Sequence, residues 1–392
     1  MISEDEALHT ILSRLQPLQA RTLPLGRAVG SYAAEDVFAR IALPPFDNSA
    51  MDGYAVVASS TRVGARLKIV GEQPAGLDRR LRVRADEAIR IFTGAPLPQG
   101  ADAVVMQEET RVEGEHVIIE TTAQSGEFVR RRGGDVAEGQ KILATGDCIT
   151  PQTLALIAAQ GISSLTVGAK VHAAIISSGD ELANDGATLQ AGQIYESNSV
   201  LLCALLEQLG AEVVSNVHCA DEAAALQTTL RAALLCDVVI ITGGVSVGAR
   251  DFVKSALHEL GATLDLWRVA VKPGKPFLFG RLGRSAIFGL PGNPVSAFVT
   301  FLLFVRPALL KLSGAPDDAL TLDQIPARLA TTIENPGERP HYVRGALRNG
   351  IFTPVGRQES HALFGLSRSN ALVRVAAGET LAADAQVTAL RL

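Results

Sequence analysis

The sequence is poor in cysteine. Its 392 residues include four cysteines, and none of them has the Cys-x-x-Cys spacing of a zinc site or a redox motif. Cys203 and Cys236 lie in apolar runs, which is typical of reduced thiols in a protein core. The pattern therefore excludes a disulfide framework and predicts a cytoplasmic protein.

Long apolar runs and an excess of basic charge are also missing. The most apolar stretch, Val295 to Val305, is too short to cross a bilayer, and the first ten residues are acidic where a signal peptide would be basic. The net charge of −5 gives no electrostatic footprint for nucleic acid. We therefore expect neither a membrane nor a nucleic acid as a partner.

What is present is the composition of an ordinary globular protein, with 47% hydrophobic and 20% charged residues. The length suggests roughly two to four domains. Short strands dominate from about residue 43 to 143 and again from about 320 to 392, whereas strands alternate with helices after Lys170. This predicts a multidomain α/β plus β protein, in which a mostly parallel sheet is covered by helices and two further domains are β-rich.

One stretch of the predicted parallel sheet has the pattern of an anion-binding loop. The apolar run from Asp237 to Thr242 predicts a strand buried on both faces. It is followed by small residues, namely Gly243, Gly244, Ser246 and Gly248. Asp251 then stands where a helix would begin, so backbone N–H groups would point at a phosphate. A tight strand-to-helix turn without a ligand is the alternative. No lysine of a P-loop follows the glycines, which disfavours an ordinary P-loop NTPase.

Carboxylates follow other strands of the same predicted sheet. Glu181, Asp221 and Asp251 all lie in loops at strand ends, where ligands bind in this class of fold. Because Mg²⁺ prefers oxygen ligands and bridges proteins to phosphates, these three residues are candidate metal ligands. Asp221 and Asp251 have a simpler alternative as helix caps, as does Asn198 at the start of another predicted helix.

Cations are concentrated in one further loop. Lys272 and Lys275 stand in the turn KPGKP, and Arg268 precedes Lys272 by four residues, so that the two would share a face of one strand. Three cations at one edge suit a phosphate or another oxyanion. A solvated basic edge is the alternative.

Polar residues also gather in the first β-rich region. Asp47, Asn48, Ser49, Asp52 and Tyr54 lie in one loop with apolar flanks, although a turn needs only one or two such residues. In the last region, Arg344 and Ser360 are further candidates, with a solvated β surface as the alternative. No Ser–His–Asp or Cys–His arrangement is evident.

Eight segments of the chain resemble, in order, those of the molybdopterin molybdenumtransferases, the family of MoeA and the E-domain of gephyrin. The segments are PPFDNSAMDGYAV, FTGAPLPQGADAVVMQEE, RRRGGDVAEGQKIL, SSGDEL, GQIYESNS, TGGVSVGARDF, KPGKP and GLPGNPVSA. The resemblance covers essentially the whole chain. Two departures are small: Ser178 stands where the family usually has Thr, and Arg268 stands where Lys also occurs.

The resemblance implies a homodimer of four-domain subunits. Its active site would lie between the α/β domain of one subunit and the DNSAMDGYA-bearing domain of the other. The boundaries that we predict are 1–18 with 169–316 for the α/β molybdopterin-binding domain, 43–141 for the DNSAMDGYA-bearing β-rich domain, 19–42 with 142–168 for a small mixed domain, and 317–392 for a C-terminal β-barrel-like domain.

The resemblance also implies a reaction. Adenylylated molybdopterin would lose AMP in a Mg²⁺-dependent step, and molybdenum from molybdate would enter the dithiolene to give molybdenum cofactor. Expected partners are molybdopterin adenylyltransferase and proteins that mature molybdoenzymes.

The expected site residues divide by role. The catalytic group is Asp52, Thr93, Asp135, Glu181, Asp221, Asp251, Lys272 and Lys275. The substrate-binding group is Ser178, Gly243, Gly244, Ser246, Gly248, Arg268, Pro291, Asn293, Arg344 and Ser360. The metal ligands are Glu181, Asp221 and Asp251.

Two other functions remain open from the sequence. The chain could be a non-catalytic scaffold of the same fold that binds a partner peptide, although Glu181, Asp251 and Lys272 would then be unnecessary together. It could instead catalyse the adenylylation step, which the additional β domains and DNSAMDGYA disfavour.

Overall fold

The computed structural model describes residues 1–183, 186–220, 222–244 and 252–392. The chain forms two compact units, each of which is described by itself. The first comprises residues 1–35, 145–151 and 164–392, and the second comprises residues 36–144 and 152–163.

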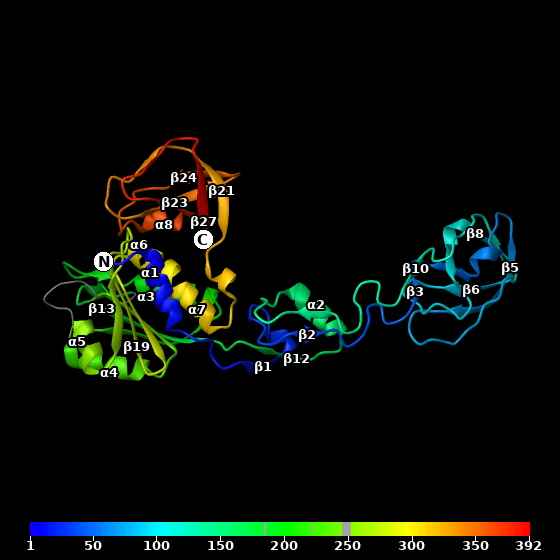
Figure 1. The fold of residues 1–392 in the computed structure, drawn as a ribbon, viewed down its shortest axis with the longest axis horizontal. Coiled ribbons are helices and arrows are strands. Elements are labelled where there is room, and N and C mark those ends of the chain that lie inside the picture. The colour runs from blue at the N-terminus through cyan, green and yellow to red at the C-terminus, as the bar shows by residue number, and fades with distance from the viewer. Residues whose placement is uncertain (184–185, 221, 245–251) are drawn as a thin grey trace. The chain divides into compact units, whose positions relative to one another are not determined.

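A six-stranded sheet is the centre of the first unit (Figure 1), with strand order β16-β13-β17-β20-β19-β18. The first four strands are mutually parallel, and β19 is antiparallel to both of its neighbours, β20 and β18. Their bounds are β13 His172–Ser178, β16 Glu212–Cys219, β17 Val238–Thr242, β18 Thr263–Arg268, β19 Pro276–Leu282 and β20 Ser285–Leu290. Residues in the middle of β17 are fully buried, as the unbroken apolar run predicts. The predicted mostly parallel α/β domain is confirmed.

Helices cover both faces of this sheet. One core contains apolar side chains from α1, α3, α6 and α7, and a separate core contains those from α4 and α5. The bounds are α1 Glu4–Ser13, α3 Asn198–Gln208, α4 Ala223–Ala233, α5 Phe252–Glu259, α6 Pro294–Thr300 and α7 Arg306–Leu312. At the start of α1, Glu6 N–H donates to Ser3 Oγ over 3.1 Å, which is the capping contact typical of a serine three residues before a glutamate.

A π-helical turn, Phe301–Val305, joins α6 to α7. It lies just before Pro307, which cannot donate a hydrogen bond within a helix. The apolar stretch from Val295 to Val305 is thus part of a longer helical run, Pro294–Leu312. Among the described residues, Pro294–Leu312 alone is long and apolar enough to cross a membrane, but 83% of it is buried inside the fold, as in a core helix.

The C-terminal part of the first unit is a closed barrel with strand order β21-β24-β23-β25-β27. The bounds are β21 Gln324–Leu329, β23 His341–Arg348, β24 Ile351–Pro354, β25 Ala371–Val375 and β27 Gln386–Arg391, with the short helix α8 Leu363–Ser367 and the strand pair β22 Ile333–Glu334 and β26 Thr380–Leu381 beside them. The predicted barrel-like domain is confirmed. Several hydrogen bonds join it to the sheet domain. Among them, Tyr342 N–H donates to Lys272 O, Lys272 N–H donates to Pro340 O, and Val295 N–H donates to Ser360 O.

The second unit contains another six-stranded sheet, with order β7-β4-β6-β5-β9-β8. Its strands are β4 Gly53–Val56, β5 Arg66–Gln73, β6 Glu87–Ile91, β7 Ala103–Met106, β8 Thr110–Glu113 and β9 His116–Ile119. Two short pairs accompany it, β3 Asn48–Ser49 with β10 Val129–Arg130 and β2 Val37–Phe38 with β11 Lys141–Leu143. The prediction that this region is rich in β-strands is confirmed.

Residues of the predicted small mixed domain belong to both units. In the first unit, β1 Arg21–Pro24 pairs with β12 Ser164–Val167, next to the turn of 3₁₀-helix Leu25–Arg27. In the second unit, β2 pairs with β11, and most of α2 Pro151–Ala159 lies there. The exact four-domain boundaries therefore stay a prediction.

Candidate active site

A cavity of about 430 Å³ lies at the carboxyl ends of three neighbouring parallel strands, β13, β17 and β20. Ligands of open α/β sheets bind at this edge. We call it the glycine-loop cavity, and it is lined by Ser178, Gly179, Glu181, Leu182, Ile194, Asn198, Thr242, Gly243, Gly244, Pro276, Pro291, Gly292, Asn293 and Ser296. Six residues expected from the sequence are thus brought together, namely Ser178, Glu181, Gly243, Gly244, Pro291 and Asn293.

Two glycines of this cavity are required by the backbone itself. Gly243 has φ +85°, and a Cβ there would lie 2.1 Å from Ser178 O. Gly244 has φ +62°, and its Cβ would lie 3.1 Å from a methyl group of Val253. The chain after β17 thus passes so close to the end of β13 that no side chain fits. Backbone groups are left to line the cavity at this point.

Asn198 has a different role from the predicted helix cap. It is the first residue of α3, and its Nδ2 donates to Thr242 Oγ1 over 2.9 Å and to Gly292 O over 2.7 Å. The helix start is instead satisfied by Glu196, whose carboxylate accepts from Ser199 N–H over 3.0 Å. Asn198 therefore ties together the loops that follow β17 and β20. Its buried Oδ1 has no hydrogen-bond partner among the described residues.

Asn198 and Thr242 are site residues that residue-by-residue reasoning missed. Asn198 stands in GQIYESNS, where its position beside Ser197 and before an apolar helical run gives it the local pattern of a cap. The feature of the sequence that could have identified Asn198 as a site residue is its place in one of the eight segments that resemble the family.

Glu181 is the one expected metal ligand within the described residues. Its carboxylate folds over Gly179, where a Cβ would lie 2.6 Å from Oε2. An exposed carboxylate in a cavity that also offers backbone groups suits Mg²⁺ with waters and phosphate as its other ligands. Asp221, Ser246, Gly248 and Asp251 lie outside the described residues. Within the described part of the chain, no group of three or more metal-ligating side chains is found.

The basic loop lies beside the cavity and joins the barrel. Lys275 is exposed and directly precedes Pro276, which lines the cavity, while Lys272 is half-buried and its backbone bridges to His341. Strand β18 ends at Arg268. The expectation that Arg268 and Lys272 share a face of one strand was therefore wrong, because the chain leaves the strand between them.

Three cations surround a buried histidine where this loop meets β23. His341 is 6% exposed, and its Nε2 has no hydrogen-bond partner among the described residues. Burial, together with the charges of Lys272, Arg344 and Arg339, lowers the pKa of His341 to about 4. The histidine is therefore neutral at physiological pH, and the surroundings are electropositive.

Arg344 is almost fully buried and holds the loop that contains Ser360. Its Nη2 donates to Arg357 O over 2.6 Å and to Glu359 O over 3.2 Å. Its Nη1 is buried and has no partner in the described structure. Ser360 O accepts from Val295 N–H, in the first turn of the helix whose Ser296 lines the cavity. The loop with Ser360 thus reaches the same helix start as the cavity.

In the second unit, the structure joins Asp52 and Thr93, which are far apart in sequence. Asp52 Oδ1 accepts from Thr93 N–H over 2.7 Å and from Thr93 Oγ1 over 2.8 Å. These hydrogen bonds lower the pKa of Asp52. Both residues are exposed, so the ionised carboxylate is oriented but accessible.

The loop that contains Asp135 is fixed to the DNSAMDGYA loop. Asp47 accepts from Arg132 N–H over 2.7 Å and pairs with the Arg131 guanidinium at 2.7 Å. These contacts lower the pKa of Asp47. Asp135 itself is exposed, and its N–H donates to Leu43 O. The second unit thus presents two exposed carboxylates, Asp52 and Asp135, on loops that hydrogen bonds and an ion pair hold in place.

Family models match three successive parts of the chain. Residues 2–161 match the MoeA N-terminal region (domain I and II), residues 174–311 match a probable molybdopterin binding domain, and residues 326–392 match the MoeA C-terminal region (domain IV). The glycine-loop cavity lies within the second of these parts.

Similar proteins agree with these matches. A molybdopterin molybdenumtransferase from Haemophilus influenzae is 40% identical, with 80% of this chain and 78% of that protein covered. Molybdopterin molybdenumtransferase 2 from Mycobacterium tuberculosis is 38% identical over 97% of this chain and 98% of its own. The crystal structure of a molybdopterin biosynthesis MoeA protein from Pyrococcus horikoshii has a TM-score of 0.86 and 30% identity, with both chains fully covered. The chain therefore belongs to the molybdopterin molybdenumtransferase family.

Proposed function

We propose that this chain inserts molybdenum from molybdate into adenylylated molybdopterin and releases AMP, which gives molybdenum cofactor. The observation that carries this proposal is the glycine-loop cavity, where a tight glycine turn and Glu181 meet at the carboxyl edge of the sheet. Backbone groups at such a turn suit the phosphates of an adenylylated substrate, because no side chain blocks their approach. The cavity lies in the segment that matches a probable molybdopterin binding domain.

A divalent cation, Mg²⁺ in our proposal, fits the same cavity. Glu181 would hold it, together with Asp221 and Asp251, which lie outside the described residues. When bound, the ion would supply positive charge against the phosphate oxygens. Glu181 is suited to this role because it lines the cavity and because an ionised carboxylate has only acceptor atoms.

The oxyanion molybdate needs cations and hydrogen-bond donors instead. We propose that Arg268 and Lys272 supply positive charge to molybdate, and that Arg344 and Ser360 supply donors. Lys275 would instead help Lys272 to bind the phosphate. The lowered pKa of His341 supports an electropositive environment around Lys272 and Arg344. The metal's sulfur ligands come from the dithiolene of the substrate, so this chemistry requires no cysteine from the chain.

We further propose a cytoplasmic homodimer in which Asp52, Thr93 and Asp135 of one subunit complete the cavity of its partner. The Asp52–Thr93 contact supports this role, because it holds an exposed carboxylate in a fixed orientation. A molybdopterin adenylyltransferase would supply the substrate, and proteins that mature molybdoenzymes would receive the product.

The test is a reaction with defined components. Purified protein is incubated with adenylylated molybdopterin, Mg²⁺ and molybdate. AMP is measured by chromatography, and active cofactor is measured by reconstitution of a cofactor-free molybdoenzyme. We expect both products to form, and omission of molybdate to abolish cofactor formation. An unchanged adenylylated substrate would contradict the proposed function.

A further inference from the structure

We propose that a second cavity in the first unit is a binding site for a small phosphomonoester that carries a flat ring. This cavity, which we call the arginine cavity, has a volume of about 640 Å³ and shares no lining residue with the glycine-loop cavity. Its size is in the range of small-molecule sites and exceeds that of a bare phosphate ion. The site is separate from the proposed reaction.

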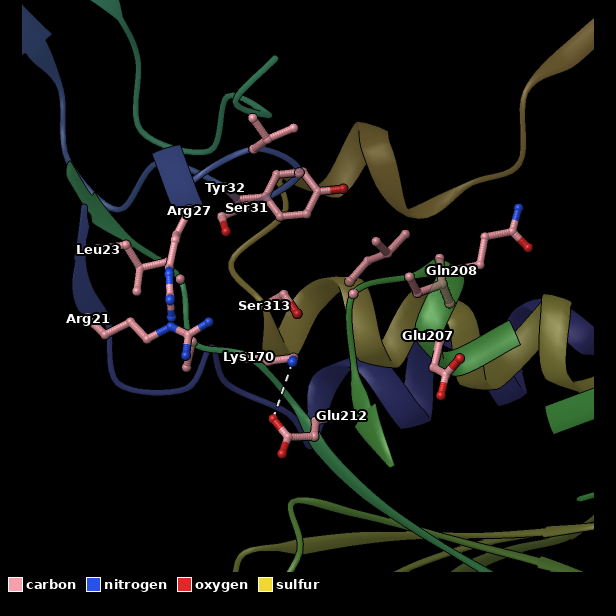
Figure 2. A pocket seen from close by; sticks show the side chains of 17 residues that line it. Arg21, Leu23, Arg27, Ser31, Tyr32, Lys170, Glu207, Gln208, Glu212 and Ser313 are labelled. Carbon is pink, nitrogen blue, oxygen red and sulfur yellow. Dashed lines mark ion pairs between the residues drawn. The ribbon is translucent and has the colours of Figure 1, made fainter. Parts of the chain in front are cut away.

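Two arginines form one wall of the arginine cavity (Figure 2). Arg21 is the first residue of β1, and Arg27 is the last residue of the 3₁₀-helix that follows. Both side chains line the cavity, are exposed, and have no hydrogen-bond or carboxylate partner in the described part of the chain. Lys170 also lines it but is paired with Glu212 at 3.2 Å. Two unpaired guanidinium groups on one cavity wall suit a phosphate, whose oxygens match their planar forks.

The opposite wall contains two helix ends, and part of their terminal carbonyl groups is hydrogen-bonded within the fold. Helices α3 and α7 both end here, and such ends carry exposed carbonyl oxygens. Some of those carbonyls already accept a backbone hydrogen bond: Glu207 O accepts from Gly210 N–H, and Leu312 O accepts from Leu18 N–H. One unpaired charge of opposite sign remains on that wall in the described structure, the exposed carboxylate of Glu207, which Figure 2 shows opposite Arg21.

The remaining lining suits the organic part of such a ligand. The ring of Tyr32 lines the cavity beside the Ser31 hydroxyl (Figure 2), and an aromatic face can stack on a flat ring. Burial raises the pKa of Tyr32, so its hydroxyl stays protonated as a donor. The wall is closed by a tight approach at Gly168, where a Cβ would lie 1.9 Å from Ser313 O. The cavity is therefore a built feature of the fold.

The test measures where a probe protects the backbone. Hydrogen exchange of the full chain is followed by mass spectrometry with adenosine 5′-monophosphate or with inorganic phosphate. We expect AMP to slow exchange in residues 21–32 and 207–212, at a concentration at least about tenfold lower than phosphate requires. Protection confined to residues 178–181 and 242–244 would report the glycine-loop cavity alone and would overturn the proposal. If AMP and inorganic phosphate protected these residues at the same concentration, the proposed stacking of a flat ring on Tyr32 would be wrong.

Variants separate binding from a general effect of charge. Arg21→Ala with Arg27→Ala should raise the AMP concentration for half-protection of residues 21–32 by at least about tenfold, whereas the exposed barrel variant Arg328→Ala should not change it. Glu207→Gln should lower that concentration about two- to threefold, since it removes a repulsive charge that solvent partly screens. Unaltered protection in the double arginine variant, or weaker protection in Glu207→Gln, would contradict the proposed site.

Discussion

At the scale of single residues, Gly243 is the most constrained position of the glycine-loop cavity. Gly243→Ala places a methyl group 2.1 Å from a backbone oxygen, so the ends of β13 and β17 must separate. We expect a loss of more than about 2 kcal/mol in unfolding free energy, whereas positive φ alone costs about 1 kcal/mol. Gly283→Ala is the matched control, because Gly283 has φ +58° and open space around its Cα. Equal thermal unfolding midpoints for the two variants would show that the close approach does not constrain the loop.

His341 makes the stability of the folded chain depend on pH. Its pKa is about 4 in the folded chain and near 6.5 when unfolded, so between these values the unfolded chain binds more protons. Stability from this residue is therefore complete above pH 6.5 and is lost as the pH falls toward 4. We expect a loss of about 2 kcal/mol between pH 7.5 and pH 5. Chemical denaturation at several pH values measures the unfolding free energy, which should fall less with decreasing pH in His341→Gln than in the unaltered protein. An identical fall in both proteins would disprove the role of His341.

At the scale of elements, α3 connects to the cavity through its first side chain. Asn198→Ala removes two hydrogen bonds that join the loops after β17 and β20. We expect roughly tenfold weaker binding of adenylylated molybdopterin by calorimetry. Ser197→Ala is the control, because Ser197 precedes α3 without a side-chain capping bond. If Ser197→Ala were the more damaging change, Asn198 would have no special part in the site.

The sequence predicted elements better than the contacts between them. The start of α1 and the strand β17 follow from a capping pattern and an unbroken apolar run, both of which are local. The role of Asn198 does not follow from local sequence, because its hydrogen-bond partners are 44 and 94 residues away. The sequence did not predict that β18 ends at Arg268, for the same reason. Val269 bridges to Ile2 and Lys272 bridges to His341, and both partners are distant in sequence.

At the scale of the whole molecule, we propose that each active site uses two subunits. A heterodimer of one Asp52→Ala subunit and one Glu181→Gln subunit would have one intact site and one doubly altered site. We expect it to recover about half of the wild-type rate of AMP release, while each parent homodimer is nearly inactive. Isolation with two different affinity tags establishes that the heterodimer is present. A pure heterodimer without recovered activity would refute the shared site.

The rate of AMP release by Glu181→Gln tests whether the glycine-loop cavity is the active site, because this change removes one charge and keeps the shape of the side chain. If adenylylated molybdopterin reacts in the glycine-loop cavity, this rate should fall at least about tenfold at every molybdate concentration. The exposed barrel variant Glu334→Gln should release AMP like the unaltered protein. Release of AMP by Glu181→Gln at the unaltered rate would contradict the claim that this cavity is the active site.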